Sequence, residues 1–406
     1  MNPIIFHIDV NSAFLSWTAL SLLQRGETED LRLIPSVIGG DSQKRHGVVL
    51  AKSGPAKAYG IKTGEPLVNA LRKCPSLVLA PPDHTMYREC SHLLMDYLSS
   101  FCPVLQQVSI DECYMDYAPI SHLYSSPMEA ALSLKNSIKE KLGFTVNIGI
   151  SDRKVLAKMA SDFQKPDQIH TLFFQEIQEK LWPLAVERLY MCGRSSAETL
   201  KKLGIITIGD LAHCDPSILE LHLKSHGITL WEFANGQDCS SVDPSPVTAK
   251  GIGNSITLSE DITTADQAHP ILLSLAEKVS KRLRGNEQYA SMVSCEIKYS
   301  SFQSVSHQTT LTSPTDSSTI LYETACQLFH QLWNNEPIRL LGIRTSKLTD
   351  KSEPRQMSLF DSSFLLKETG SPSPEKIKKL DLALDSIKNK YGNDAVMRAS
   401  LLSKGL

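Results

Sequence analysis

The sequence contains no long apolar run. A helix that crosses a bilayer needs roughly 20 consecutive apolar residues, and no segment of the 406 residues approaches that length. The N-terminus carries no basic leader, and Asp9 places a charge in the first apolar stretch before the core of a signal peptide could form. We therefore expect a cytoplasmic protein with no membrane partner.

Paired cysteines are also missing. The 9 cysteines are odd in number and scattered, and no two of them form a Cys-x-x-Cys motif. This pattern argues against a disulfide framework and against a structural zinc site. We expect reduced, mostly buried thiols.

An excess of positive charge, the usual mark of a nucleic-acid-binding protein, is absent. The net charge is −2 and the isoelectric point is about 6.6. A basic groove can still exist locally, because phosphate groups respond to the nearest patch of charge. The length exceeds what one compact core holds, so we expect roughly two to four domains.

The first 170 residues alternate between strands and helices. Expected strands cover residues 4–10, 104–110, 113–117 and 144–150, and expected helices cover residues 13–24, 86–101 and 127–142. This pattern predicts an α+β sheet with helices on one face. The first strand ends at Asp9, and the second and third strands flank Asp111 and Glu112.

The remainder of the chain has three parts. Residues 171–235 are helical in pattern, and the polar stretch 236–246 is typical of a linker. Residues 251–348 predict the order β-α-β-β-α-β. A Ser/Pro-containing tail then ends in an amphipathic segment, and the sequence leaves open whether that segment packs on the body or binds a partner. Its apolar residues, on one helical face, are Ile377, Leu380, Leu384, Ile387 and Tyr391.

Asp9, Asp111 and Glu112 are candidate metal ligands. Two-metal nucleotidyl transfer needs carboxylates that bridge cations about 3.5–4 Å apart, and Mg²⁺ prefers hard oxygen ligands. Adjacent strands would bring the three side chains together. The alternative is a capping Asp9 and an exposed Asp111–Glu112 turn, and spacing alone favours that alternative.

Several motifs resemble those of the Y-family DNA polymerases, the DinB/UmuC-like translesion enzymes of bacteria. The motifs are His7-Ile8-Asp9-Val10-Asn11-Ser12-Ala13-Phe14, Gln107-Val108-Ser109-Ile110-Asp111-Glu112-Cys113-Tyr114, Gly60-Ile61-Lys62-Thr63-Gly64, Gly149-Ile150-Ser151 and Leu156-Ala157-Lys158-Met159-Ala160-Ser161-Asp162 with Lys165-Pro166. They follow the family's order and spacing over about residues 1–350. The two branches, DinB-like and UmuC-like, are not separated by these motifs.

The resemblance implies roles for single residues. Asp9, Asp111 and Glu112 would hold two Mg²⁺ ions, with the carbonyl of Val10 as an extra oxygen ligand. Phe14 would be the steric gate against a ribose 2′-OH, and Lys165 would contact the triphosphate. A core Phe14 and a solvated Lys165 are the alternatives.

The chain departs from the family at two places. Asn11 stands where members often carry a second Asp, so this position is not expected to be an essential ligand. The family's Tyr-x-x-Arg of the fingers aligns with Gly54-Pro55-Ala56-Lys57. Lys57 supplies charge without the bidentate fork of arginine.

The resemblance also implies contacts to DNA and to a partner protein. Gly193 and Arg194 would belong to a helix-hairpin-helix that binds phosphates through backbone N–H groups, although Met191 replaces its first glycine. Lys281 and Arg282 would contact DNA, in a cluster with Lys278 and Arg284. The alternative is that this cluster is an ordinary solvated helix face. Gln356, Leu359 and Phe360 resemble the pentapeptide that binds the bacterial sliding clamp.

The combined prediction is a monomeric right-hand polymerase that copies past damaged template with low fidelity. Its partners would be primer-template DNA, dNTPs and the clamp, with nucleoid association on DNA. The expected domains are a palm (1–17 and 73–170), fingers (18–72), a thumb (171–236), a linker (237–248), a little finger (249–349) and a tail (350–406). The alternatives are a catalytically weak family member that recruits other proteins, and another palm-type transferase such as a nucleotide cyclase.

Overall fold

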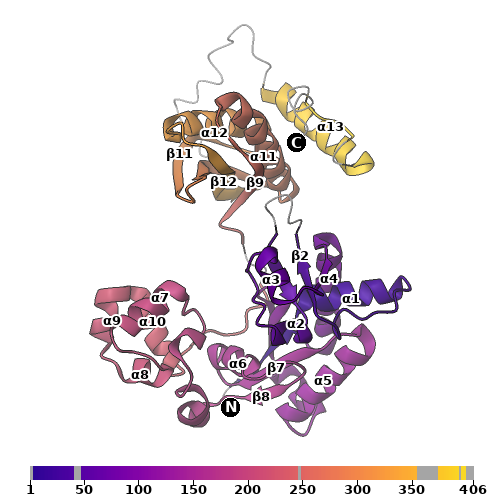
Figure 1. The fold of residues 1–406 in the computed structure, drawn as a ribbon, viewed down its shortest axis with the longest axis vertical. Helices are drawn as coiled ribbons and strands as arrows, with labels where there is room; N and C mark the ends of the chain where they lie inside the picture. Colours follow the sequence, from indigo (N-terminus) through magenta and orange to yellow (C-terminus); the bar gives the residue numbers. More distant parts are fainter. Residues whose placement is uncertain (1–2, 41–46, 246–247, 354–373, 393–394, 399–406) are drawn as a thin grey trace. The chain divides into compact units, whose positions relative to one another are not determined.

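The computed structural model describes residues 3–40, 47–245, 248–353, 374–392 and 395–398. The chain divides into two compact units, residues 1–42 with 47–246, and residues 43–46 with 247–406. Each unit is described by itself (Figure 1). The predicted clamp-binding residues 356–360 lie outside the described part of the chain.

A five-stranded sheet is central to the first unit, in the order β5-β6-β1-β7-β8. Its strands are β1 (Ile5–Val10), β5 (Leu105–Gln107), β6 (Glu112–Asp116), β7 (Val146–Ser151) and β8 (Ile169–Thr171). Strand β1 pairs antiparallel with both β6 and β7. All its residues are buried, because helices cover both faces of the sheet.

The side chains of β1 alternate between these two faces. On one face, Phe6, Ile8 and Val10 share a core with α4 (His84–Phe101) and α5 (Pro127–Leu142). On the other face, Ile5 packs against Ala157 of α6 (Lys154–Ser161). The expectation of helices on one face is therefore wrong, because α6 covers the second face. That face also carries Asp9.

A small three-stranded sheet follows β1 in the chain, in the order β3-β2-β4. Its elements are α1 (Ala13–Gln24), β2 (Ser36–Gly39), β3 (Val49–Lys52), α2 (Gly54–Ala58), α3 (Leu67–Lys73) and β4 (Val78–Ala80). Helix α1 packs against both sheets. Trp17 lies in the core of the five-stranded sheet, and Leu15 lies in a core with Ile38 of β2.

Beyond β8, the described elements of the first unit are all helical, as the sequence predicted. A short 3₁₀ turn at Ala118–Leu123 precedes α5. The elements beyond β8 are the short turns Phe174–Glu176, Ile177–Leu181 and Val186–Arg188, followed by α7 (Arg194–Lys202), α8 (Ile208–His213), α9 (Pro216–Leu223) and α10 (Ser225–Ala234). Their apolar faces share one core. In the described residues, no helix has the length and apolar character that crossing a membrane requires.

The second unit has the predicted β-α-β-β-α-β order. Its elements are β9 (Gly251–Ile262), α11 (Ala265–Gly285), β10 (Gln288–Tyr299), β11 (Ser304–Thr315), α12 (Ser318–Leu332) and β12 (Ile338–Asp350). The strands form an antiparallel sheet in the order β11-β10-β12-β9. Both helices share one core with this sheet.

A last helix, α13 (Pro374–Tyr391), packs on α11 through ion pairs and on α12 through hydrogen bonds. Nε of Arg284 lies 2.6 Å from a carboxylate oxygen of Asp385. The hydroxyl of Ser318 donates to Asp381 at 2.7 Å. The guanidinium of Arg284 and the carboxylate of Asp381 are almost fully buried, so α13 is part of this unit (yellow in Figure 1).

The amphipathic segment therefore packs on the body, but through its charged face. Leu384 is partly buried. Leu380, Ile387 and Tyr391, which share the apolar face, stay exposed. Helical spacing identified the helix but not the face that it buries.

Candidate functional site

Asp9 and Glu112 face each other across β1 and β6. Their Cα atoms are register partners in the antiparallel pairing, and directly opposite residues of two strands point to the same face of a sheet. Asp9 is 7% exposed. The fold thus brings together two carboxylates that are 103 positions apart in the sequence.

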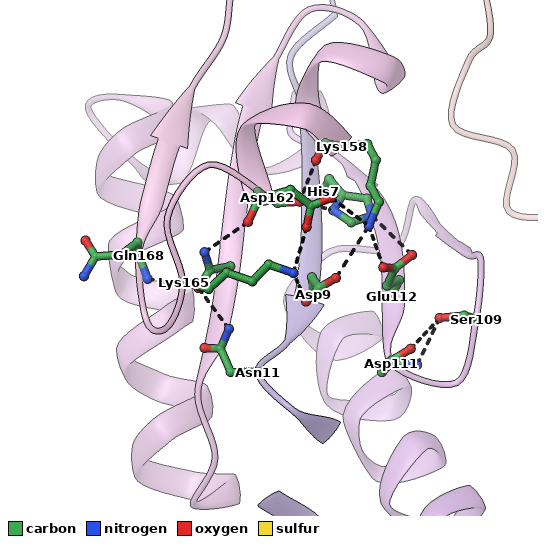
Figure 2. Close-up of polar contacts among 12 residues, drawn as sticks. His7, Asp9, Asn11, Ser109, Asp111, Glu112, Lys158, Asp162, Lys165 and Gln168 are labelled. Carbon is green, nitrogen blue, oxygen red and sulfur yellow. Dashed lines mark hydrogen bonds and ion pairs between the residues drawn. The ribbon is translucent and has the colours of Figure 1, made fainter. Parts of the chain in front are cut away.

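Two lysines from the segment after β7 neutralise these carboxylates (Figure 2). Nζ of Lys158 in α6 lies 2.5 Å from Glu112 Oε1 and 3.5 Å from Asp9 Oδ2. Nζ of Lys165 lies 2.7 Å from Asp9 Oδ1 and 2.8 Å from Asp162 Oδ1. Lys158 is nearly buried, so its charge is part of the site and is not an incidental surface cation.

Burial and pairing shift the pKa values of these groups in opposite directions. Burial raises the pKa of Asp9, and the contact with Glu112 adds to the rise, while Lys165 opposes it. Burial also opposes ionisation of Glu112, but the contacts with Asp9 and Lys158 outweigh it and hold the pKa of Glu112 below its usual range. The pKa of Lys158 is raised because its contact with Glu112 outweighs burial. The pair therefore prefers an anionic Glu112 beside a cationic Lys158.

His7 lies directly behind Glu112. Its Nδ1 is 2.8 Å from the hydroxyl of Ser161, and that hydroxyl donates to the carbonyl of Lys158. Ser161 must therefore accept from His7, which places the ring proton on Nδ1. The Nε2 atom then directs a lone pair toward Glu112, 3.8 Å away. Burial lowers the pKa of His7.

Asp111 adjoins this cluster, but its carboxylate is engaged elsewhere. The hydroxyl of Ser109 donates to Asp111 Oδ1 at 2.6 Å, and the N–H of Val10 donates to the Asp111 carbonyl at 3.1 Å. Among the described residues, no three His, Cys, Asp or Glu side chains converge as metal ligands. The structure thus joins Asp9 with Glu112 and places Asp111 next to them, with its carboxylate directed toward Ser109 (Figure 2).

The donor set nevertheless fits a divalent cation. Asp9 and Glu112 supply the hard oxygen atoms that Mg²⁺ prefers, and both approach one ammonium group, that of Lys158. This pair of carboxylates therefore already stabilises a positive charge. Rotation of Asp111 away from Ser109 would add a third carboxylate.

A network that sequence reasoning missed holds the segment that carries Lys165. Asn147 is fully buried in β7, and its side-chain N–H groups donate to the carbonyls of Ser161 and Gln164. Its oxygen accepts from the side chain of Asn11 and from the N–H of Gln168. All four hydrogen-bonding positions of the amide are used. The only sequence signal was a polar residue inside an apolar strand.

Phe14 lies on the first turn of α1 and is held by aromatic packing. Its ring stacks on that of Tyr87 with centroids 4.4 Å apart and an interplanar angle of 10°. The hydroxyls of Tyr87 and Thr18 are hydrogen bonded at 2.9 Å. Phe14 is only partly buried, so one part of the ring packs in the core and another part is accessible.

Lys57 lies on the small three-stranded sheet's helix α2. The hydroxyl of Ser53 caps this helix by accepting from the N–H of Ala56. Lys57 is exposed, and a side chain at Gly54 would meet no atom within 4 Å. This region therefore offers an open surface that carries the charge of Lys57.

The predicted DNA-binding residues differ in their surroundings. Gly193 is the N-cap of α7, and Arg194 is 93% exposed in its side chain, where it pairs with Glu198. Arg282 is exposed and donates to the carbonyl of Gly253. Lys281 is partly buried on the same helix. Arg284, in contrast, is buried in the ion pairs with α13, which excludes it from an exposed cluster with its neighbours.

Comparison with known proteins gives a consistent result along the whole chain. Residues 8–162 match the impB/mucB/samB family, and residues 249–359 match the C-terminal domain of that family. DNA polymerase IV of Clostridium acetobutylicum is 45% identical over 404 residues, which cover 100% of this chain and 99% of that protein. DNA polymerase IV of Alkaliphilus oremlandii is 38% identical over 408 residues and 100% of both chains.

A solved structure shows the same fold. A Y-family DNA polymerase chimera superposes with a TM-score of 0.75 and 20% sequence identity, covering 86% of this chain and 99% of the chimera. The predicted fold, an α+β right-hand architecture with a β-α-β-β-α-β domain, is confirmed by this likeness.

Proposed function

The chain belongs to the impB/mucB/samB family of Y-family DNA polymerases and is a DNA-directed DNA polymerase, and from this premise we propose that it extends primers past damaged template with low fidelity. The observation that carries the proposal is the pairing of Asp9 with Glu112, with Lys165 beside Asp9. Two carboxylates and a nearby cation suit a reaction in which a triphosphate must be bound and a hydroxyl activated.

We assign the metal site to Asp9, Asp111 and Glu112, with the carbonyl of Val10 as a further oxygen ligand. Two Mg²⁺ ions bound there would activate the primer hydroxyl and neutralise charge on the triphosphate. Lys158 keeps Glu112 anionic, and the ring of His7 lies behind it. Lys165 carries the cation best placed to leave Asp9 for a phosphate oxygen.

Phe14 is proposed as the gate that selects deoxynucleotides. Stacking on Tyr87 fixes the plane of the ring, and a fixed bulky group discriminates by shape against an added hydroxyl. Replacing Phe14 by Ala should therefore admit ribonucleotides into the product. Unchanged discrimination between dNTP and rNTP would remove this role.

The grip on the triphosphate is proposed to be weaker than an arginine would give. Lys57 offers a single point charge, and Gly54 offers no side chain. Lys57→Arg should lower the KM for dNTP, whereas Lys57→Ala should raise it. No change in KM in either variant would remove Lys57 from the nucleotide site.

Contacts with DNA and with a partner protein complete the proposal. Gly193 and Arg194 would bind backbone phosphates, and Lys281 and Arg282 would add charge from the second unit. Gln356, Leu359 and Phe360 would bind a bacterial sliding clamp as an extended peptide. Replacing Leu359 and Phe360 by Ala should abolish clamp binding and leave unassisted extension intact; retained affinity would place the contact elsewhere. We propose that the protein acts as a monomer and associates with the nucleoid when it is bound to DNA.

Primer extension with Mg²⁺ and dNTPs tests the central claim. The wild type should extend a primer, and Asp9→Ala and Asp111→Ala should abolish extension. Asp96→Ala, which removes an exposed carboxylate from α4, is the matched control and should keep full activity. A wild type that extends nothing at high enzyme concentration but still binds DNA and clamp would support the rival function, a recruitment factor.

A further inference from the structure

Two histidines converge on the outer surface of the second unit. His269 lies near the start of α11, and His330 lies near the end of α12. Their Nε2 atoms are 3.1 Å apart. His330 is exposed and His269 is half-buried, so the pair lies at the solvent boundary of this unit.

Aromatic packing holds both rings in place. His269 meets Phe329 edge to face, with centroids 6.3 Å apart and an interplanar angle of 73°. His330 meets the same ring at 5.4 Å. Phe329 is fully buried and stacks on Trp333 at 5.4 Å. The two imidazoles therefore lose little freedom on binding a ligand, which lowers the entropic cost.

The separation of the two nitrogens matches that of a chelating pair. A transition metal lies about 2.0–2.1 Å from an imidazole nitrogen, so two nitrogens at bond angles between about 90° and 110° are about 2.8–3.4 Å apart. The observed 3.1 Å falls within this interval. Without a metal, the same contact requires one ring to be protonated on Nε2 and the other on Nδ1. An ion satisfies both lone pairs at once.

We propose that His269 and His330 bind one divalent transition-metal ion of the kind that prefers imidazole, such as Zn²⁺, Ni²⁺ or Cu²⁺. Mg²⁺ prefers oxygen ligands, so this site is chemically distinct from the carboxylates of the first unit. Within the described residues no third His, Cys, Asp or Glu side chain completes it. Water fills the remaining coordination positions.

The ion would cross-link the two helices of the unit. α11 and α12 share one core with the sheet, and a bridge between their surfaces stabilises the folded unit relative to the unfolded chain. Ligand-induced stabilisation of this kind increases with the concentration of free ion above its dissociation constant. Added ion should therefore raise the melting temperature of the second unit.

Titration of the full-length chain with CuCl₂ tests the proposal. The variants are His269→Gln and His330→Gln, which keep a hydrogen-bonding side chain at each position. His92→Gln on α4, an exposed histidine in the first unit, is the control. Calorimetry should show one more bound Cu²⁺ per chain in the wild type and in His92→Gln than in either of the other variants. The electron paramagnetic resonance spectrum of that extra ion should show two nitrogen ligands.

In this proposal the loss of either histidine already removes the site, so the double variant should bind as many Cu²⁺ ions as each single variant. ZnCl₂ should raise the melting temperature of the wild type and leave the double variant unchanged. Equal stoichiometry and equal thermal shifts in the wild type and the double variant would overturn the proposal. An equal loss in His92→Gln would do the same, because binding would then be a general property of surface histidines.

Discussion

Replacing Gly149 by Ala should disrupt the contact on which the site depends. Gly149 lies in β7, opposite His7, where α6 crosses the sheet. A Cβ atom there would lie 1.9 Å from the carbonyl oxygen of Ala157 and 2.5 Å from the backbone nitrogen of Ser161. Both neighbours are backbone atoms, so α6 itself must move by about 1 Å. Overpacking of this kind typically costs about 1–3 kcal/mol, and the double backbone clash places this site at about 3 kcal/mol.

The displacement should also affect catalysis. Helix α6 carries Lys158, which contacts both Glu112 and Asp9, and a misplacement of about 1 Å can lower a rate about a hundredfold. In a unit of this size, a loss of about 3 kcal/mol lowers the melting temperature by about 6–12 °C. Calorimetry of the full-length chain and primer extension measure the two effects.

Gly285→Ala is the matched control for this experiment. The same methyl group at the end of α11 would meet nothing within 4 Å, and alanine has the better helix propensity by about 1 kcal/mol. Its melting temperature should stay the same or rise, with full activity. If Gly149→Ala has the melting temperature and the primer-extension activity of the wild type, α6 does not cross β7 as closely as described, and the reasoning fails.

Asn147→Ala should lower the free energy of unfolding by about 3 kcal/mol or more, because several buried partners lose a hydrogen bond; urea unfolding measures this, and a loss below about 1 kcal/mol would contradict it. Burial lowers the pKa of His7 below its unfolded value of 6.5, so the unfolded chain binds the proton first and stability falls as the pH drops below about 6.5. His7→Asn, which keeps a donor to Ser161, should flatten that dependence in urea unfolding between pH 7.5 and 5.5, and an unchanged slope would assign it to other groups. Met191 has a φ of 70°, so Met191→Gly should stabilise the first unit by about 1 kcal/mol in thermal unfolding; a lower melting temperature would mean that its side chain contributes more than the strain costs.

Apolar periodicity was sufficient to predict the elements that carry the site. The buried strand ending at Asp9 and the strand beside Glu112 both follow from short apolar runs, and the β-α-β-β-α-β order follows from alternation and helical spacing. These signals are local, so a single sequence contains them. The pairing of the two strands is not local, and only the resemblance to a known family suggested it.

Other features depend on contacts between distant segments. Lys158 looks like an ordinary helical lysine, and its contact with two carboxylates exists because α6 crosses the second face of the sheet. Asn147 gave no more than a polar residue in a strand, and its four hydrogen bonds depend on the loop that returns over it. Arg284 was grouped with surface cations, although two aspartates about 100 positions later bury it. Charge in a sequence does not reveal whether its partner is water or protein.

The ion pairs of α13 bear on where the second unit ends. The match to the family's C-terminal domain stops at residue 359, before α13 begins at Pro374. A chain truncated there would keep Arg284 but lose both of its aspartates and the helix that covers it. The hydrogen bonds from Ser318 and the ion pair between Glu277 and Lys388 would be lost with them. A shortened protein designed from the family boundary would therefore fold less stably than the natural chain, for a reason that the boundary itself does not reveal.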